Sequence, residues 1–302
     1  MTLEEKKEIA KDLLAYCDKY ESRNVASRTL KKISPSTIST IANGNFEKIS
    51  DDMFTNIRWQ VSIKSGEWNI QETDGMKDMF YALGDAQENR NVTWVTGSAG
   101  CGKTMANRAY MMEHKEVYYI LCSNDMNKFD FVRELARVIG ISSDKNSIRE
   151  AMDSIIRALG CKESPLLIFD EGDKLSDAIL FYFITIYNRL EDKVGIVFTS
   201  TDNIKRRMSL GLHYNKQGYQ EIYSRIGRKF IDLRLTTNAD VYGICAANGI
   251  ETKADLKEVL KEAEAGDYDL RVVKKAIHKR KIINELQSRP KDGQDEREQV
   301  QG

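Results

Sequence analysis

The sequence predicts an α/β protein: a parallel sheet covered by helices, preceded by an all-helical module and followed by a small helical lid. Between residues 66 and 236, short apolar stretches alternate with stretches of helical periodicity, a pattern typical of parallel strands buried on both faces. Residues 1–65 and 237–286 show apolar residues only at helical spacing. Residues 287–302 contain almost no apolar side chains, and we expect them to form a disordered tail.

The composition excludes several classes of protein. With 302 residues, of which 41% are hydrophobic and 30% charged, the chain is suited to a globular protein of more than one domain. Lys and Arg (46) balance Asp and Glu (46), so the net charge indicates no partner. The five cysteines lack CxxC spacing and only three histidines occur, which argues against a disulfide framework and a zinc site.

The sequence also predicts no association with a membrane. The first residues are charged and amphipathic, unlike a signal peptide. The longest uncharged apolar run, residues 178–187, is too short to cross a bilayer. We therefore expect a cytoplasmic protein.

Capping signals divide the first module into four helices. Ser-Pro-Ser begins one of them and Asn-Gly ends it, because Ser caps helix N-termini and Gly terminates helices. The module resembles a helix-turn-helix in which residues 36–41 form the recognition helix, with Ser39 and Thr40 as donors to DNA. A protein-docking domain is the alternative, because residues 1–64 carry eleven basic and nine acidic residues. The helices are expected at 3–20, 24–32, 36–42 and 50–63.

In the predicted core, each strand is a short run rich in β-branched and aromatic residues, with helical stretches between the strands. This order predicts crossover connections and therefore parallel pairing. The expected strands are 92–96, 117–122, 166–170, 195–200 and 230–235. The expected helices are 75–88, one that starts at 103, 127–139, 147–160, 176–190 and 219–227.

The strongest chemical signal is a glycine-rich loop between the first strand and its helix. The loop fits the pattern G-x-x-x-x-G-K-[ST] in the strand–loop–helix context that the pattern requires. Its glycines let backbone N–H groups turn towards phosphate oxygens, and the helix N-terminus adds positive potential. We expect Lys103 to bind the β- and γ-phosphates of ATP and the Thr104 hydroxyl to bind Mg²⁺. The loop comprises Gly97, Ser98, Ala99, Gly100, Cys101, Gly102, Lys103 and Thr104.

A second signal is the apolar run LLIFD at 166–170, which ends in two adjacent carboxylates. Asp170 is expected to support the hydrated Mg²⁺ ion. Glu171 is expected to activate the attacking water. Downstream of a phosphate-binding loop, this pair predicts hydrolysis of the nucleotide.

The strand at 195–200 ends in polar residues that can orient the water beside Glu171. Thr201 is the preferred candidate, with Ser200 and Asn203 as alternatives. Ordinary turn chemistry explains these residue types equally well.

Three arginines are candidates for contacts to the γ-phosphate. Arg225, or second Arg228, precedes the last strand, an edge from which an arginine can reach the nucleotide of a neighbouring subunit. Arg271 opens a helix of the predicted lid and can reach the nucleotide of its own chain. The alternative for each is a solvated surface arginine.

Two segments of the chain are strongly basic. Residues 205–229 contain seven basic residues and one acid, and residues 271–281 contain six and none. Such clusters suit the phosphates of nucleic acids, although a solvated surface is the alternative for each. The predicted DNA-contacting residues of the first segment are Lys205, Arg206, Arg207 and Lys216.

Together, GSAGCGKT, LLIFDEGDKL, GIVFTSTDN, YSRIGRKF and YDLRVVKKAI resemble, in type and order, the motifs of AAA+ ATPases. With the helix-turn-helix in front, the chain is similar to the Mu B-, TnsC- and IstB-like target-selection group. The resemblance implies a phosphate-binding AAA+ core, and it assigns Thr201 as sensor 1, Arg225 as the trans finger and Arg271 as sensor 2. It also implies ATP-dependent homo-oligomers or helical filaments on largely non-specific double-stranded DNA. A DDE transposase is the implied partner, in a bacterial or phage-infected cell.

Two other functions are compatible with the same motifs. One is a helicase loader of the DnaC type, in which the first module would dock a protein instead of DNA. The other is a helix-turn-helix regulator that uses ATP as a switch and recognises one specific site.

Overall fold

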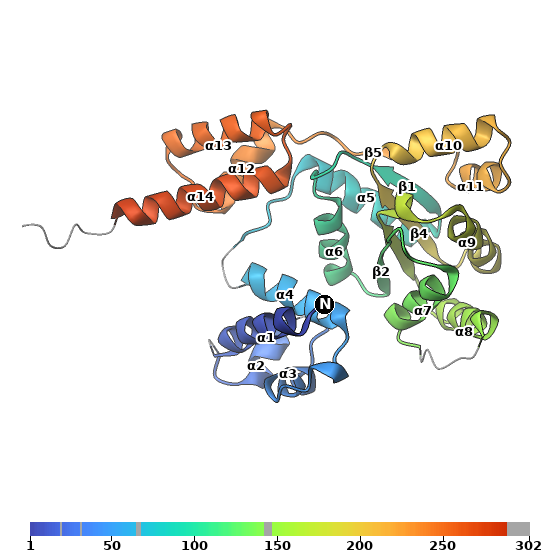
Figure 1. The fold of residues 1–302 in the computed structure, drawn as a ribbon, viewed down its shortest axis with the longest axis horizontal. Coiled ribbons are helices and arrows are strands. Elements are labelled where there is room, and N and C mark those ends of the chain that lie inside the picture. The colour runs from blue at the N-terminus through green and yellow to red at the C-terminus, as the bar shows by residue number, and fades with distance from the viewer. Residues whose placement is uncertain (19, 31, 65–67, 142–146, 289–302) are drawn as a thin grey trace, which may run out of the picture. The chain divides into compact units, whose positions relative to one another are not determined.

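The computed structural model describes residues 1–18, 20–30, 32–64, 68–141 and 147–288. The chain forms two compact units (Figure 1), one made of Met1–Gln71 with Ile244–Gly249 and the other of Glu72–Gly243 with Ile250–Gly302. The predicted boundary at residues 65–66 lies outside the described residues, as does the predicted tail except for residues 287–288, which belong to a helix and not to a tail.

The first unit is helical, as its sequence predicts. Four serine or threonine side chains accept a backbone N–H at the start of a helix, and Thr2 does so in a capping box with Glu5. Its core contains the fully buried side chains of Leu13, Ile38 and Phe54. The second helix ends earlier than predicted, at Thr29. The elements are α1 (Leu3–Cys17), α2 (Arg23–Thr29), α3 (Pro35–Ala42), the 3-10 helix η1 (Phe46–Lys48) and α4 (Asp51–Lys64).

The second unit contains a parallel sheet of five strands in the order β2-β3-β4-β1-β5. The predicted α/β class is confirmed. The predicted strand at 230–235 is reduced to two residues, because β5 pairs with β1 only opposite Val95 and Thr96. The strands are β1 (Val92–Thr96), β2 (Val117–Leu121), β3 (Leu166–Asp170), β4 (Gly195–Ser200) and β5 (Ile231–Asp232).

One helix of this unit, α10, was not predicted. Its sequence NIKRRMSLGLH is dominated by polar and basic residues, and no side chain caps its N-terminus. It is held in place by the buried side chains of Ile204 and Met208. The helices are α5 (Asp74–Asn89), α6 (Lys103–Glu113), α7 (Lys128–Ile139), α8 (Ile148–Gly160), the 3-10 helix η2 (Gly172–Lys174), α9 (Asp177–Leu190), α10 (Asn203–His213), α11 (Tyr219–Arg225), α12 (Asn238–Ala247), α13 (Lys253–Ala265) and α14 (Leu270–Ser288).

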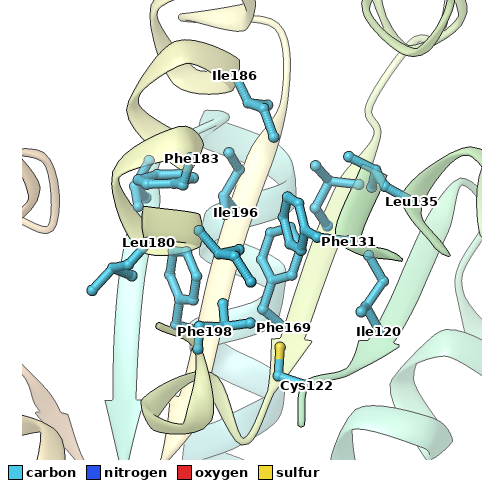
Figure 2. Close-up of a cluster of buried hydrophobic side chains, with 14 of the residues drawn as sticks. Ile120, Cys122, Phe131, Leu135, Phe169, Leu180, Phe183, Ile186, Ile196 and Phe198 are labelled. Carbon is cyan, nitrogen blue, oxygen red and sulfur yellow. The ribbon is translucent and has the colours of Figure 1, made fainter. Parts of the chain in front are cut away.

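Aromatic packing fills one face of the sheet (Figure 2). Phe198 of β4 stacks on Phe169 of β3 at 5.1 Å between ring centroids and meets Phe183 of α9 edge-on at 5.0 Å. On the other face, Met79 and Leu83 of α5 belong to a separate buried cluster. Burial on both faces explains why β3 and β4 have no exposed residue.

The register of the sheet brings the polar strand ends together. Thr96 lies opposite Ser200, and Asp170 lies opposite Thr199. Because all the strands are parallel, their carboxyl ends share one edge, and the glycine-rich loop leaves β1 at that edge.

A glycine in β4 provides a test of this packing. A Cβ at position 195 would lie 2.7 Å from the carbonyl carbon of Ala86, so we expect Gly195→Ala to lower the free energy of unfolding by about 1–3 kcal/mol. The matched control is Gly160→Ala at the end of α8, where an added Cβ meets nothing within 4 Å. That change should be neutral or stabilising by up to about 1 kcal/mol. Urea unfolding of both variants measures the difference, and equal midpoints would contradict the predicted overlap.

Candidate functional site

The glycine-rich loop connects β1 to α6 and carries its lysine on the first residue of the helix. Lys103 Nζ donates to the carbonyl oxygens of Gly97 at 2.7 Å and Ser98 at 2.8 Å. Gly100 and Gly102 have φ values of 76° and 95°, a region that disfavours other residue types. The loop therefore has the backbone freedom that a phosphate cradle requires.

Asp170, at the end of β3, is 1% exposed and is held by four donors. The hydroxyls of Thr104 and Tyr119 donate to its Oδ2 at 2.7 and 2.9 Å. The Thr199 hydroxyl donates to Oδ1 at 2.6 Å and the Glu171 backbone N–H donates to it at 3.0 Å. The contacts place Asp170 beside the loop residue Thr104, as the sequence predicts for a shared Mg²⁺ site.

Thr104 and Asp170 fit a Mg²⁺ ion chemically. Both present oxygen atoms, which Mg²⁺ prefers, and a Mg²⁺ site needs only one or two protein oxygens when a nucleotide and water supply the rest. Among the described residues, no group of three or more His, Cys, Asp or Glu side chains is arranged to hold a metal ion. The protein alone therefore offers a partial site, which a nucleotide would complete.

Glu171 follows Asp170 in a left-handed conformation, with φ of 57°. This conformation turns the chain into η2, and the Glu171 carboxylate forms an ion pair with Lys174. The hydrogen bond to Glu171 raises the pKa of Lys174. Since 38% of the Glu171 side chain is exposed, the carboxylate is open to water, as a general base requires.

The hydroxyls of Thr201 and Thr199 contact different carboxylates. Thr201, the predicted sensor, donates to Asp173 at 2.8 Å. The hydroxyl that meets Asp170 belongs to Thr199, which is fully buried within β4. Sequence reasoning missed Thr199 because it considered only Ser200, the last residue of the strand, and the residues that follow it. Because side chains alternate along a strand, the side chains of Thr199 and Phe198 lie on opposite faces of the sheet, and Thr199 lies on the face of α6. This alternation could have indicated Thr199.

Two other residues near Asp170 were also missed. Tyr119 of β2 reaches Asp170 from the neighbouring strand, and burial raises its pKa, which keeps the phenol a donor. Asn107 of α6 is fully buried and donates to the Thr199 hydroxyl at 3.1 Å. Its Oδ1 has no partner among the described residues. No motif predicts either residue, because their contacts depend on which strand lies next to β3.

The candidate finger arginines differ in exposure. Arg225 donates to Asn188 Oδ1 at 2.6 Å and to the Glu221 carbonyl at 3.0 Å, and it lies over the ring of Tyr187 at 5.1 Å. Arg228 is exposed and has a left-handed backbone with φ of 57°. Arg225 is thus bound within its own chain, and Arg228 projects to solvent.

Arg271 lies in the first turn of α14, and its side chain is exposed. The preceding residue, Leu270, donates its backbone N–H to the Gly100 carbonyl at 3.0 Å. The first turn of α14, which carries Arg271, therefore contacts the glycine-rich loop.

The basic residues of α10 and of the turn that follows it have different surroundings. Arg206 and Lys216 are exposed, and Lys205 forms ion pairs with Asp202 and Asp232. Arg207 is directed into the fold, where it pairs with Asp177 and donates to the Leu175 carbonyl at 2.7 Å. These contacts give Arg207 a structural role and leave Arg206 and Lys216 on the surface.

The predicted DNA donors of the first unit lie on α3. Ser39 is exposed, and the Thr40 hydroxyl donates to the Ser36 carbonyl at 2.8 Å. The Ser34 hydroxyl accepts from the Thr37 backbone N–H at 3.1 Å and caps the helix.

Among the helices that the structure describes, none has the length and apolar character needed to cross a membrane.

The Thr199 hydroxyl can be tested by two substitutions. Thr199→Val leaves Asn107 without its acceptor and removes one donor to Asp170, so it should lower the free energy of unfolding by about 1–3 kcal/mol. Thr199→Ser keeps the hydroxyl and should cost about 1 kcal/mol or less for the missing methyl. Chemical denaturation followed by circular dichroism measures both, and an equal cost would show that the hydroxyl does not matter.

Comparison with known proteins agrees with this geometry. Residues 86–208 match the family model described as an AAA domain. The Mu-like prophage FluMu DNA transposition protein B of Haemophilus influenzae is 26% identical over 203 residues, which cover 67% of this chain and 69% of the relative.

Among solved structures, the chain is similar to chains in assemblies of the Drosophila ORC. The ORC bound to DNA has a TM-score of 0.45 and 11% identity over 70% of this chain, which spans 55% of the ORC chain. The ORC bound to AT-rich DNA and Cdc6 has a TM-score of 0.36 and 14% identity, over 78% of this chain and 88% of the other.

The glycine-rich loop, the buried Asp170, the parallel sheet and the sequence relatives converge on one group. Residues 86–208 match an AAA domain, and the chain is similar to a Mu-like transposition protein B.

Proposed function

We propose that this protein is a Mg²⁺-dependent ATPase that assembles on double-stranded DNA and recruits and activates a DDE transposase in DNA transposition. The observation that carries the proposal is the contact between Thr104 of the phosphate loop and the buried carboxylate of Asp170. The matching AAA domain and the transposition protein B relative support it.

The residues of the site would have different roles in ATP hydrolysis. Lys103 would release the carbonyls of Gly97 and Ser98 to bind the β- and γ-phosphates. Thr104 and Asp170 would hold Mg²⁺, which when bound neutralises charge on the triphosphate. Glu171 would accept the proton of the attacking water, for which it must leave its ion pair with Lys174.

The sensor roles remain part of the proposal. The Thr201 hydroxyl donates to Asp173, which lies two residues after Glu171 in the same turn. The helices α12, α13 and α14 would form the lid, from which Arg271 reaches the γ-phosphate. A neighbouring copy would supply Arg225, which must first leave Asn188, or the exposed Arg228.

DNA binding would use the basic surface around α10, with Ser39 and Thr40 of α3 as further contacts. Arg206 and Lys216 are exposed there, and exposed cations bind phosphates without sequence preference. Binding of ATP would favour homo-oligomers on DNA, to which the transposase is recruited.

Two substitutions test the ATPase. Lys103→Ala removes the phosphate-binding cation and should abolish ATP binding and ATP-dependent assembly on duplex DNA. Glu171→Gln keeps the shape but removes the general base, so it should bind ATP, lower hydrolysis by about 10²–10⁴-fold and stabilise assemblies on DNA. Nucleotide titration, phosphate release and electron microscopy with duplex DNA measure these effects. A Glu171→Gln variant that binds ATP but never assembles on DNA would contradict the proposal.

Neighbouring arginines of α10 allow a matched test of the DNA surface. Arg206→Ala should reduce the slope of log K against log salt by about 0.9 for each DNA phosphate that the variant no longer neutralises, and it should leave the unfolding midpoint unchanged. Arg207→Ala should instead lower the free energy of unfolding by about 1–3 kcal/mol, because it removes the bonds to Asp177 and Leu175. Salt titrations of DNA affinity and thermal unfolding separate the two. An unchanged slope for Arg206→Ala would exclude this residue from the DNA surface.

A further inference from the structure

The first turn of α14 contacts the phosphate loop at two of its glycines. The Leu270 backbone N–H donates to the Gly100 carbonyl oxygen at 3.0 Å. A Cβ on Gly102 would lie 3.3 Å from Leu270 Cδ1. As the first residue of the helix, Leu270 has no acceptor for its N–H within α14, so the loop carbonyl supplies one.

Asp269 covers the same part of the loop. A Cβ on Gly100 would overlap the Asp269 carboxyl group, which therefore lies against the backbone of Gly100. The position of this carboxylate is fixed by its own helix, because Asp269 Oδ1 accepts the Arg271 backbone N–H at 2.7 Å. Asp269 and Leu270 together form what we name the loop–lid contact.

The turn that leads into α14 has an unusual backbone. Asp267 and Tyr268 are consecutive non-glycine residues with φ values of 49° and 57°, a sparsely populated conformation that persists only where surrounding contacts enforce it. Tyr268 is held at both ends: its N–H donates to the Ala263 carbonyl at 2.8 Å, and its hydroxyl donates to Asn238 Oδ1 at 2.8 Å. The turn thus delivers Asp269 and Leu270 onto the loop.

We propose that Leu270 and Asp269 are positioning residues for nucleotide binding, acting through the backbone of Gly100; this inference rests on the proposed function. A phosphate cradle needs its N–H groups directed inward, and so its carbonyls directed outward. By donating to the Gly100 carbonyl, the Leu270 N–H of α14 holds this carbonyl directed away from the phosphate cradle. A loop fixed in this way loses less conformational freedom when ATP binds, and the affinity is higher for that reason.

ATP binding should in turn affect the loop–lid contact. If the loop–lid contact strengthens ATP binding, bound ATP must strengthen the loop–lid contact by the same factor. The first turn of α14, which carries Arg271, would then be held more firmly in the ATP-bound protein than in the free protein.

A pair of substitutions at one position isolates the hydrogen bond. Leu270→Pro removes the backbone N–H at the first helical position, where proline is tolerated, and also removes the leucine side chain. Leu270→Ala removes the side chain but keeps the N–H. We expect Leu270→Pro to bind ATP about three- to ten-fold more weakly than Leu270→Ala, as the loss of one hydrogen bond implies. The maximal rate at saturating ATP should stay within about two-fold.

Hydrogen exchange of the unmodified protein tests the same contact without a variant. The Leu270 amide should be protected in the free protein, and a slowly hydrolysed ATP analogue should increase that protection. This measurement applies even if Leu270→Pro fails to fold.

The outcomes separate the two proposals. Equal ATP affinities for Leu270→Pro and Leu270→Ala would overturn the loop–lid contact, and so would a Leu270 amide that exchanges freely. If the unmodified protein takes up no ATP, the proposed function fails instead.

Discussion

The site depends on the carboxylate of Asp170, which is buried and yet fully hydrogen-bonded. Burial of an ionised group is costly unless donors compensate for the lost water. Here the donors come from α6 through Thr104, from β2 through Tyr119 and from β4 through Thr199. One charge therefore fixes the relative positions of three elements, and the loss of any one donor is felt by the others.

This saturation has a consequence for the arrival of a metal ion. Thr104 and Tyr119 both donate to Oδ2, and Thr199 and the Glu171 N–H both donate to Oδ1. A carboxylate has about four lone-pair sites, so water molecules of a hydrated Mg²⁺ ion would have to replace a donor. The loop lysine and Glu171 are likewise bound within the chain, to loop carbonyls and to Lys174. Nucleotide binding at this site would therefore require these residues to exchange partners within the chain for partners on the nucleotide.

Most elements of the fold could be predicted from patterns close together in the sequence. The strand at 166–170 and the loop that ends at Thr104 follow local rules of periodicity and glycine content, and both are where the sequence analysis expects them. Helix α10 was missed because polar and basic residues dominate its sequence and its N-terminus lacks a side-chain cap. The strand at 230–235 was predicted too long because pairing with β1, not residue type, sets its length.

By itself, the sequence determined the phosphate loop, the two carboxylates after β3 and the order of strands and helices, because each rests on residues within a few positions of one another. Only the tertiary structure decided which hydroxyl reaches Asp170. It brought Thr199 and Tyr119 to Asp170, because strand order and register place these residues together. It also directed Arg207 into the fold and brought Leu270 to Gly100. Such contacts join residues far apart in the chain, and no local spacing encodes them.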